Sequence, residues 1–189
     1  MNKDRKIYIS KVKRFAKSKT GLAKLSKIAP DVANVIKEHP EYLDIAQYRN
    51  DPRVAGVYTN YIFGDLFYIG SSGNVFLREC EHCYSFIKEA EFYGHKYEPT
   101  IPCEFKPVAV GMTDPDLREM LEFNAIRSLK PILQWTDPDS PEFGTDKPIS
   151  QGETRDSIRP DVCIDFSLRI KRFNMAQQKY NKKLKNVET

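Results

Sequence analysis

The sequence of 189 residues has no long hydrophobic run, and its longest apolar stretches, such as PVAVGM at residues 107–112, are far too short to cross a bilayer. We therefore expect no membrane segment and no membrane partner. The first ten residues, MNKDRKIYIS, hold no apolar stretch followed by a cleavage site. Since a secretory signal requires both, we expect a cytoplasmic protein.

Cysteine is also scarce, with four residues at positions 80, 83, 103 and 163. Without a secretory signal, so few cysteines indicate free thiols rather than a disulfide framework. The sequence shows no internal repeat and no long low-complexity tract. A hydrophobic content of 40% is nevertheless enough for a core, so the composition predicts one modest domain that folds without cross-links.

The formal net charge of +4 hides a strong segregation along the chain. Residues 1–28 hold ten Lys or Arg against one acid, and residues 166–186 hold seven against none. The remaining stretch, 29–165, has thirteen basic and twenty-four acidic side chains, a net charge of −11. Basic ends around an acidic body suit a polyanion, because each Lys or Arg that meets a phosphate releases a counterion. Solvated helix faces are the alternative interpretation of the same charges.

Helical spacing of apolar residues, with lysines on the other side, marks residues 11–48. Pro30 and Pro40 are each followed by an acid, which is typical of a helix restart and divides this stretch into two or three short helices. After Pro52 the pattern changes to short aromatic and β-branched runs at 55–62 and 66–72, joined by Phe-Gly-Asp. These features predict a β-hairpin.

Helical spacing returns at residues 75–93, followed by a third expected strand at 105–112 and a helix that Thr113 opens and Pro131 ends. The order of elements predicts an α+β fold with a small three-stranded antiparallel sheet flanked by helices. Helices are expected in addition at both chain ends. We divide the chain into a basic helical arm (1–50), a central unit (51–135), and an acidic, proline-rich linker with a basic helix (136–189). A chain of residues 50–136 is expected to fold alone.

Two aromatic-glycine triplets, Gly56-Val57-Tyr58 and Tyr68-Ile69-Gly70, lie on the expected hairpin. Arg78 and His82 follow one helical turn apart, and Glu122 lies on a later helix, with an apolar residue four positions on and a proline nine positions on. In this order and spacing, residues 54–134 resemble the GIY-YIG nucleases. One position departs from that family, which often has asparagine where this chain has Gln134; the amide is kept on a longer side chain.

The resemblance implies a DNA endonuclease that acts on double-stranded DNA with Mg²⁺ or Mn²⁺. Glu122 is then the metal ligand, since carboxylate oxygen suits these ions, and Arg78 holds a phosphate with its planar guanidinium. Tyr58 is the favoured general base, and Tyr68 orients the water or the phosphate. His82 either supports Tyr58 through a hydrogen bond or is itself the base, because imidazole titrates near neutral pH.

Further residues are expected in supporting roles. Gly70 lets the backbone pass closely at the end of the second strand, and Gly56 belongs to the first triplet. Ser71, Ser72 and Asn74 are expected to cap the helix that carries Arg78, with a phosphate contact as their second role. Gln134 is expected to give a hydrogen bond to the hairpin.

A zinc site is the rival interpretation of this stretch. Cys80 and Cys83 have C-x₂-C spacing, and His95 and Cys103 follow. Structural sites usually carry such a pair on a turn, whereas this pair lies on an expected helix, so we favour free thiols. Trp135 is expected to cover the core rather than stack on a base.

Within the nuclease hypothesis, a phage or mobile-element (homing) endonuclease, encoded by a phage in a bacterial host, is favoured because such enzymes carry a separate DNA-binding tail. A restriction endonuclease is the alternative, because restriction enzymes of this family add insertions to the central unit, and residues 1–50 and 84–104 could be such insertions. A catalytically inactive nucleic-acid-binding protein with the same fold is the second alternative. The presence of Tyr58, Tyr68, Arg78 and Glu122 argues against it.

Overall fold

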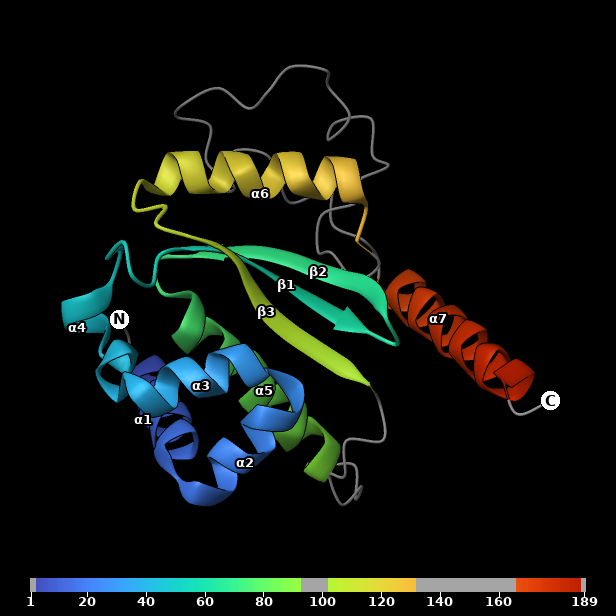
Figure 1. Cartoon of the computed structure of the whole chain (residues 1–189), viewed down its shortest axis with the longest axis horizontal. Helices are drawn as coiled ribbons and strands as arrows, with labels where there is room; N and C mark the ends of the chain where they lie inside the picture. Colours follow the sequence, from blue (N-terminus) through green and yellow to red (C-terminus); the bar gives the residue numbers. More distant parts are fainter. Residues whose placement is uncertain (1–2, 93–101, 132–165, 188–189) are drawn as a thin grey trace.

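The computed structural model describes residues 3–92, 102–131 and 166–187 (Figure 1). Along these residues the elements are α1 (Lys3–Lys17), α2 (Lys19–Ile28), α3 (Pro30–Glu38), the 3₁₀ helix η1 (Pro40–Leu43), α4 (Ile45–Tyr48), β1 (Gly56–Ile62), β2 (Asp65–Ser72), α5 (Val75–Phe92), β3 (Cys103–Val110), α6 (Pro115–Leu129) and α7 (Phe166–Val187). The helical stretch at the N-terminus begins at Lys3, eight residues before the sequence pattern predicted it.

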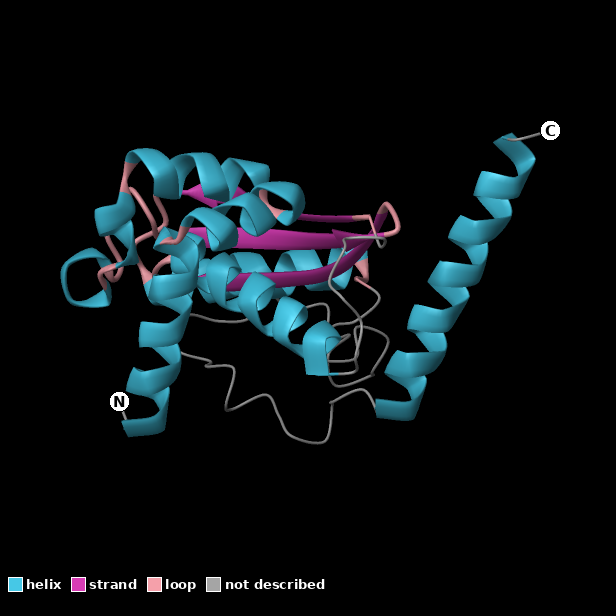
Figure 2. Ribbon diagram, turned by 90° about the horizontal axis from the view of Figure 1, so that it is seen from below, coloured by secondary structure: helices cyan, strands magenta, loops and turns pink. Residues whose placement is uncertain are grey.

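The three strands form one antiparallel sheet in the order β2-β1-β3, which makes β1 the central strand. Tyr58 of β1 lies opposite Gly70 of β2 and opposite Pro107 of β3. Pro107 has no backbone N–H to donate and is tolerated because β3 is an edge strand. Helices lie on both faces of the sheet (Figure 2). The expected α+β class, with a small three-stranded antiparallel sheet flanked by helices, is confirmed.

The hairpin between β1 and β2 closes through Phe63 and Gly64, both with positive φ (57° and 77°). A two-residue turn of this kind matches the right-handed twist of the paired strands. Asp65, which the sequence pattern assigned to the turn, is instead the first residue of β2 and lies opposite Ile62.

Helix α6 covers one face of the sheet (Figure 1). Val57 of β1 and Ile69 of β2 are buried there against Phe123 and Ile126 of α6. Asp114 precedes the helix, and its side chain accepts a hydrogen bond from the backbone N–H of Asp116. The expected N-cap, Thr113, was therefore wrong by one residue. Asp and Thr both suit this position, so the sequence pattern alone did not separate them.

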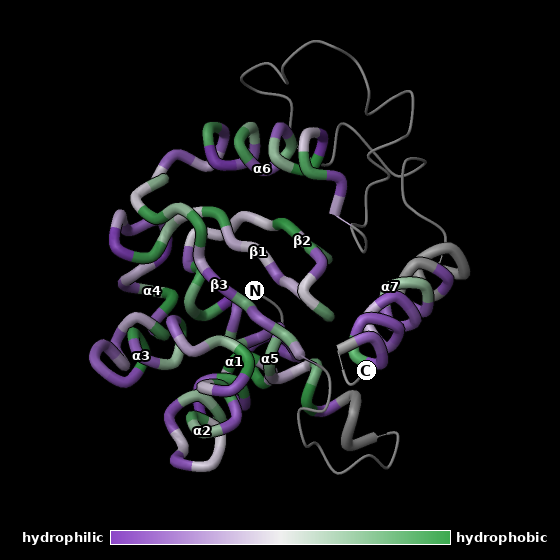
Figure 3. Tube along the Cα trace, turned by 45° about the vertical axis from the view of Figure 1, so that its right-hand side comes forward, coloured by the Kyte–Doolittle hydropathy of each residue, from purple (hydrophilic) through white to green (hydrophobic). Residues whose placement is uncertain are grey.

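The opposite face of the sheet carries the larger core, which α5 shares with the N-terminal helices. Its buried residues include Ile9, Val12 and Ala16 of α1, Leu25 and Ile28 of α2, Val32 and Ile36 of α3, Tyr58 of β1, and Val75, Leu77, Cys80 and Cys83 of α5. Hydrophobic and hydrophilic segments alternate along α1, α2 and α3, as expected for helices with one buried side (Figure 3). The lysines counted in the sequence thus lie on helices whose apolar side is part of the core.

Helix α7 stands apart from the other helices and lies near the hairpin end of the sheet (Figures 1 and 2). Ala176 is buried with Phe63 and Phe67, and the ring of Tyr180 lies 5.4 Å from that of Phe63. Lys179 Nζ lies 3.1 Å from Asp65 Oδ1. Among the described helices, α7 included, none combines the length and the apolar character that a bilayer crossing needs.

Candidate active site

Helix α5 carries Arg78 and His82, and a hydrogen-bonded cap fixes where it begins. Asn74 Oδ1 accepts a hydrogen bond from the backbone N–H of Leu77 at 3.0 Å. Ser72 Oγ in turn accepts one from the backbone N–H of Asn74 at 3.1 Å. The expected capping roles of Asn74 and Ser72 are therefore present in the structure, and they hold the first turn of α5 against the end of β2.

Tyr58, Tyr68 and His82 form one cluster between the sheet and α5. The hydroxyl of Tyr58 lies 3.1 Å from His82 Nε2, a hydrogen bond between residues 24 positions apart. The ring centroids are 6.0 Å apart for the two tyrosines, 5.5 Å for Tyr58 and His82, and 5.6 Å for Tyr68 and His82. The two triplet tyrosines and the histidine are thus in mutual contact.

Gly70 makes room for this cluster. A Cβ atom at Gly70 would lie 2.5 Å from Tyr58 Cζ and 2.8 Å from Tyr68 Cε1, and nearer still to the Tyr58 hydroxyl. Gly70 lies opposite Tyr58 in the sheet and is the one residue of β2 without a side chain. The ring of Tyr58 therefore crosses β2 at Gly70. Gly56 has a different reason: a Cβ atom there would collide with the backbone carbonyl of Ala109 in β3. Both glycines serve close approach.

Burial sets the charge state of the cluster. The pKa of Tyr58 is raised well above 10, chiefly because the phenol is buried and secondly because Tyr68 is close; the charge of Arg78 opposes this. Burial, helped by the positive charge of Arg78, lowers the pKa of His82 to about 3. At neutral pH both groups are uncharged. In the tautomer of the neutral imidazole that carries its proton on Nδ1, Nε2 is the acceptor and the Tyr58 O–H donates the hydrogen bond to it.

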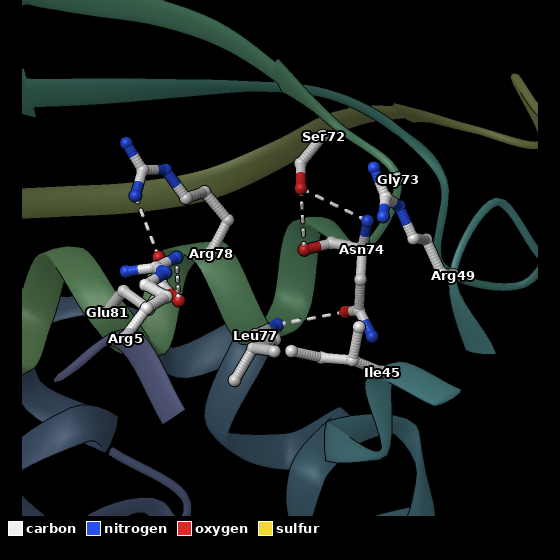
Figure 4. A pocket seen from close by; sticks show the side chains of 9 residues that line it. All are labelled: Arg5, Ile45, Arg49, Ser72, Gly73, Asn74, Leu77, Arg78 and Glu81. Atoms are coloured by element: carbon white, nitrogen blue, oxygen red, sulfur yellow. Dashed lines mark hydrogen bonds and ion pairs between the residues drawn. The ribbon is translucent and has the colours of Figure 1, made fainter. Parts of the chain in front are cut away.

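Arg78 lies at the edge of this cluster and is partly exposed. Its Nη1 donates to Glu81 Oε2 at 2.7 Å, and the other carboxylate oxygen of Glu81 accepts from Arg5 Nη2 at 2.6 Å (Figure 4). The side chain of Arg78 is 39% exposed, while that of Glu81 is 3% exposed. The buried carboxylate of Glu81 therefore binds the guanidinium groups of Arg5 and Arg78, and both arginine side chains stay partly exposed to solvent.

Glu79 is a buried acid that the sequence analysis did not single out. It is fully buried on α5, and burial raises the pKa of its carboxyl well above the usual range, which favours the protonated form. With the Asn60 amide nitrogen turned toward it, that nitrogen lies 3.0 Å from Glu79 Oε2. Val75, Glu79 and Cys83 are four residues apart on α5 and so lie on the same side of the helix. This spacing was the signal in the sequence that predicts a buried Glu79.

Glu122 is buried on the other side of β2. It is 3% exposed on α6, and Ser71 Oγ donates a hydrogen bond to its Oε2 at 2.6 Å. The expectation that Ser71 caps α5 was wrong, because its side chain points to α6 instead. Ser71 shares the face of Ile69 by strand alternation, whereas Tyr68 and Gly70 share the face of α5. The edge strand thus separates Glu122 from the tyrosine cluster.

The two parts of the candidate site meet at the end of β2. Ser71 contacts Glu122, and the next two residues, Ser72 and Gly73, line a pocket of about 440 Å³ together with Arg78. An extended ligand that crosses the end of this edge strand would therefore meet Arg78 on one side and the region of Glu122 on the other.

Two cysteines of the alternative zinc interpretation lie in the core. Cys80 and Cys83 are buried, and burial raises the pKa of both thiols. Within residues 3–92, 102–131 and 166–187, no group of three or more His, Cys, Asp or Glu side chains is arranged to hold a metal ion. His95, Gln134 and Trp135 lie outside the described residues.

Comparisons with known proteins add no assignment. Neither the protein-family models, nor the curated proteins, nor the solved structures with which the chain was compared gave a match.

Proposed function

We propose that this chain is a metal-dependent DNA endonuclease of the GIY-YIG type that hydrolyses phosphodiester bonds. The observation that carries the proposal is the hydrogen bond between Tyr58 and His82, with Tyr68 in ring contact and Arg78 beside them. A hydroxyl, an imidazole and a guanidinium at one end of a sheet are the groups that phosphodiester hydrolysis needs to move a proton and to hold a phosphate.

A proton route follows from the charge states. A phenol with a raised pKa is almost never ionised at neutral pH, so Tyr58 acts as a relay and not as a free phenolate base. It takes a proton from the attacking water while its own proton passes to His82 Nε2, which accepts its hydrogen bond when the imidazole proton is on Nδ1. Tyr58 is neutral before and after the transfer, and the positive charge appears on His82. Tyr68 lies against both rings and orients the water.

Arg78 binds the phosphate and makes the proton route depend on phosphate binding. Its exposed guanidinium can bind a non-bridging oxygen of the phosphate with donors that Glu81 does not use. Its positive charge lowers the pKa of His82 in the free protein. A bound phosphate offsets that charge, which raises the pKa of the imidazole and favours proton transfer to it.

Glu122 is the residue that would hold Mg²⁺ or Mn²⁺. Its carboxylate and the adjacent Ser71 hydroxyl both offer oxygen atoms as ligands, and hard divalent cations such as Mg²⁺ prefer oxygen ligands. When bound, such an ion supplies charge that stabilises the transition state and the leaving oxygen. Because Glu122 is 3% exposed, we expect metal binding to replace the hydrogen bond from Ser71.

Cleavage of supercoiled plasmid DNA tests the proposal. The purified protein should nick the plasmid with Mg²⁺ or Mn²⁺ and not with EDTA. Tyr58→Phe should lower the single-turnover rate by about 10²–10⁴-fold, the usual contribution of acid–base catalysis. His82→Ala should leave a measurable remnant, since water can replace its acceptor. The opposite ranking would make His82 the base, and binding of DNA without any nicking would favour the inactive nucleic-acid-binding alternative.

The favoured subtype is a phage or mobile-element enzyme, and a restriction endonuclease is the second candidate. The observation that favours a restriction endonuclease is the core that α1, α2, α3 and α5 share. Because of this core, residues 3–48 are an addition packed on the central unit and not a separate arm. The length of the recognition site separates the two. Sequencing the ends left in a digested genomic library should give a long, degenerate site for the first subtype and a short, strict one for the second.

A further inference from the structure

The pocket at the end of β2 is strongly basic although the central part of the sequence is acidic. Three arginines line it: Arg5 from α1, Arg49 after α4, and Arg78 from α5 (Figure 4). Among the described residues, Glu81 is the only acid that lines it, so these three arginines and one glutamate carry a net charge of +2. These arginines come from three separate elements, and only Arg78 belongs to the pattern that resembles a nuclease.

The arginines differ in how they are held. Arg5 and Arg78 both pair with Glu81, at 2.6 and 2.7 Å. Figure 4 draws no hydrogen bond or ion pair from Arg49 to the other residues of the pocket. Its backbone is nevertheless fixed, because the next residue, Asn50, donates its N–H to the carbonyl of Gly73 at 2.8 Å. Arg49 therefore presents its charge at a fixed edge of the pocket.

The charge and volume of the pocket suit a phosphate group. A cavity of about 440 Å³ has room for a phosphate group with water. A net positive charge supplied by guanidinium forks suits phosphate oxygens. Among the described residues that line it, the apolar side chains are Ile45 and Leu77.

We propose that this pocket binds a backbone phosphate of the DNA next to the scissile one, with Arg5 and Arg49 as positioning residues. The proposal rests on the proposed nuclease function. Arg78 is shared between the pocket and the tyrosine cluster, so a strand held by Arg49 and Arg5 is directed across the end of β2 toward Tyr58. In this arrangement the N-terminal helices contribute to the active site through Arg5 and Arg49, and their role is to fix where the cut phosphate lies.

Binding of a short DNA duplex, measured in EDTA over a range of salt concentrations, tests the pocket separately from cleavage. Arg49→Ala should weaken binding about tenfold at low salt, because it removes one charge-assisted contact. It should also flatten the slope of log affinity against log salt by about 0.9, the value for one phosphate. Arg49→Lys should restore the slope, since it restores the charge.

Lys17→Ala is the matched control. Lys17 is an exposed residue of α1, as is Arg5, and twelve residues of helix place it about 18 Å away along the axis. Arg5→Ala serves as a second test and should weaken binding as Arg49→Ala does.

The outcomes separate the two proposals. If Arg49→Ala and Arg5→Ala bind and cut no differently from Lys17→Ala while the parent protein cuts DNA, the pocket is not a phosphate site and the nuclease proposal stands. If the parent never cuts but both variants lose affinity and slope, the pocket stands as a DNA phosphate site, and both the nuclease proposal and the position next to a cut phosphate fail.

Discussion

Replacing Gly70 by alanine tests the geometry of the tyrosine cluster most specifically. The added Cβ would lie 2.5 Å from Tyr58 Cζ and 2.8 Å from Tyr68 Cε1, and contacts below 3.0 Å do not persist in real structures. The ring of Tyr58 must therefore move by about 0.5 Å or more. Tyr58 is 1% exposed and packed against α5, so this movement is resisted on all sides. Overpacking of this kind costs about 1–3 kcal/mol of stability.

The same movement should interrupt the proton route. The Tyr58 hydroxyl is 3.1 Å from His82 Nε2 and is the atom closest to the added Cβ, so a shift of about 0.5 Å distorts the length or the angle of this hydrogen bond. We expect Gly70→Ala to lower the single-turnover cleavage rate by about 10²-fold or more, in line with the loss of acid–base catalysis. DNA affinity should change little, because Gly70 is not among the residues that line the arginine pocket.

A double-mutant cycle separates this effect from general destabilisation. In Tyr58→Phe, which already lacks the relay, the additional change Gly70→Ala should lower the rate far less than it does in the parent protein. Thermal unfolding of each variant provides the stability comparison. A Gly70→Ala protein with the parent's melting temperature and cleavage rate would refute the assigned packing of Tyr58 against Gly70.

Two further predictions concern the stability of the fold. Because the pKa of His82 is lowered to about 3 in the folded chain, its contribution to stability is complete above its ordinary value of 6.5 and is lost progressively as the pH falls below it. The melting temperature should therefore fall between pH 6.5 and 5, and it should fall less in His82→Asn; equal slopes would contradict the buried neutral imidazole. The expectation that a chain of residues 50–136 folds alone is revised, because such a chain leaves the apolar side of α5 without α1 and α3. It should give no cooperative melt, and a sharp melting transition for that chain would contradict the shared core.

The sequence predicted those parts of the fold that local pattern determines. The hairpin was visible because aromatic and β-branched runs flank Phe-Gly-Asp, and the start of α5 was visible because Asn74 caps it. The sheet followed from these elements and from the third strand. The charge count, by contrast, favoured a detached arm at residues 1–50. A charge count includes only the charged side chains, so it left out Ile9, Val12 and Ala16, which are buried in the core.

The candidate site was predictable in its residue types and not in its arrangement. The resemblance suggested a hydrogen bond between Tyr58 and His82, but it did not reveal that Ser71 turns to Glu122 on the opposite face of the sheet. Strand alternation between Gly70 and Ser71 was the available signal for that separation. Arg5 and Arg49 had no local signal, because only the tertiary packing of α1 and α4 brings them to the end of β2.

The central claim is that Glu122 and the tyrosine cluster act together in metal-dependent cleavage, and Glu122→Gln tests it most directly. The change removes the carboxylate charge and keeps the side-chain size. Glu119→Gln is the matched control, since it makes the same chemical change one turn earlier on α6. We predict that Glu122→Gln lowers the Mg²⁺-dependent single-turnover rate by several orders of magnitude with unchanged or tighter DNA binding, while Glu119→Gln cuts normally. Near-parental cleavage by Glu122→Gln would contradict the account.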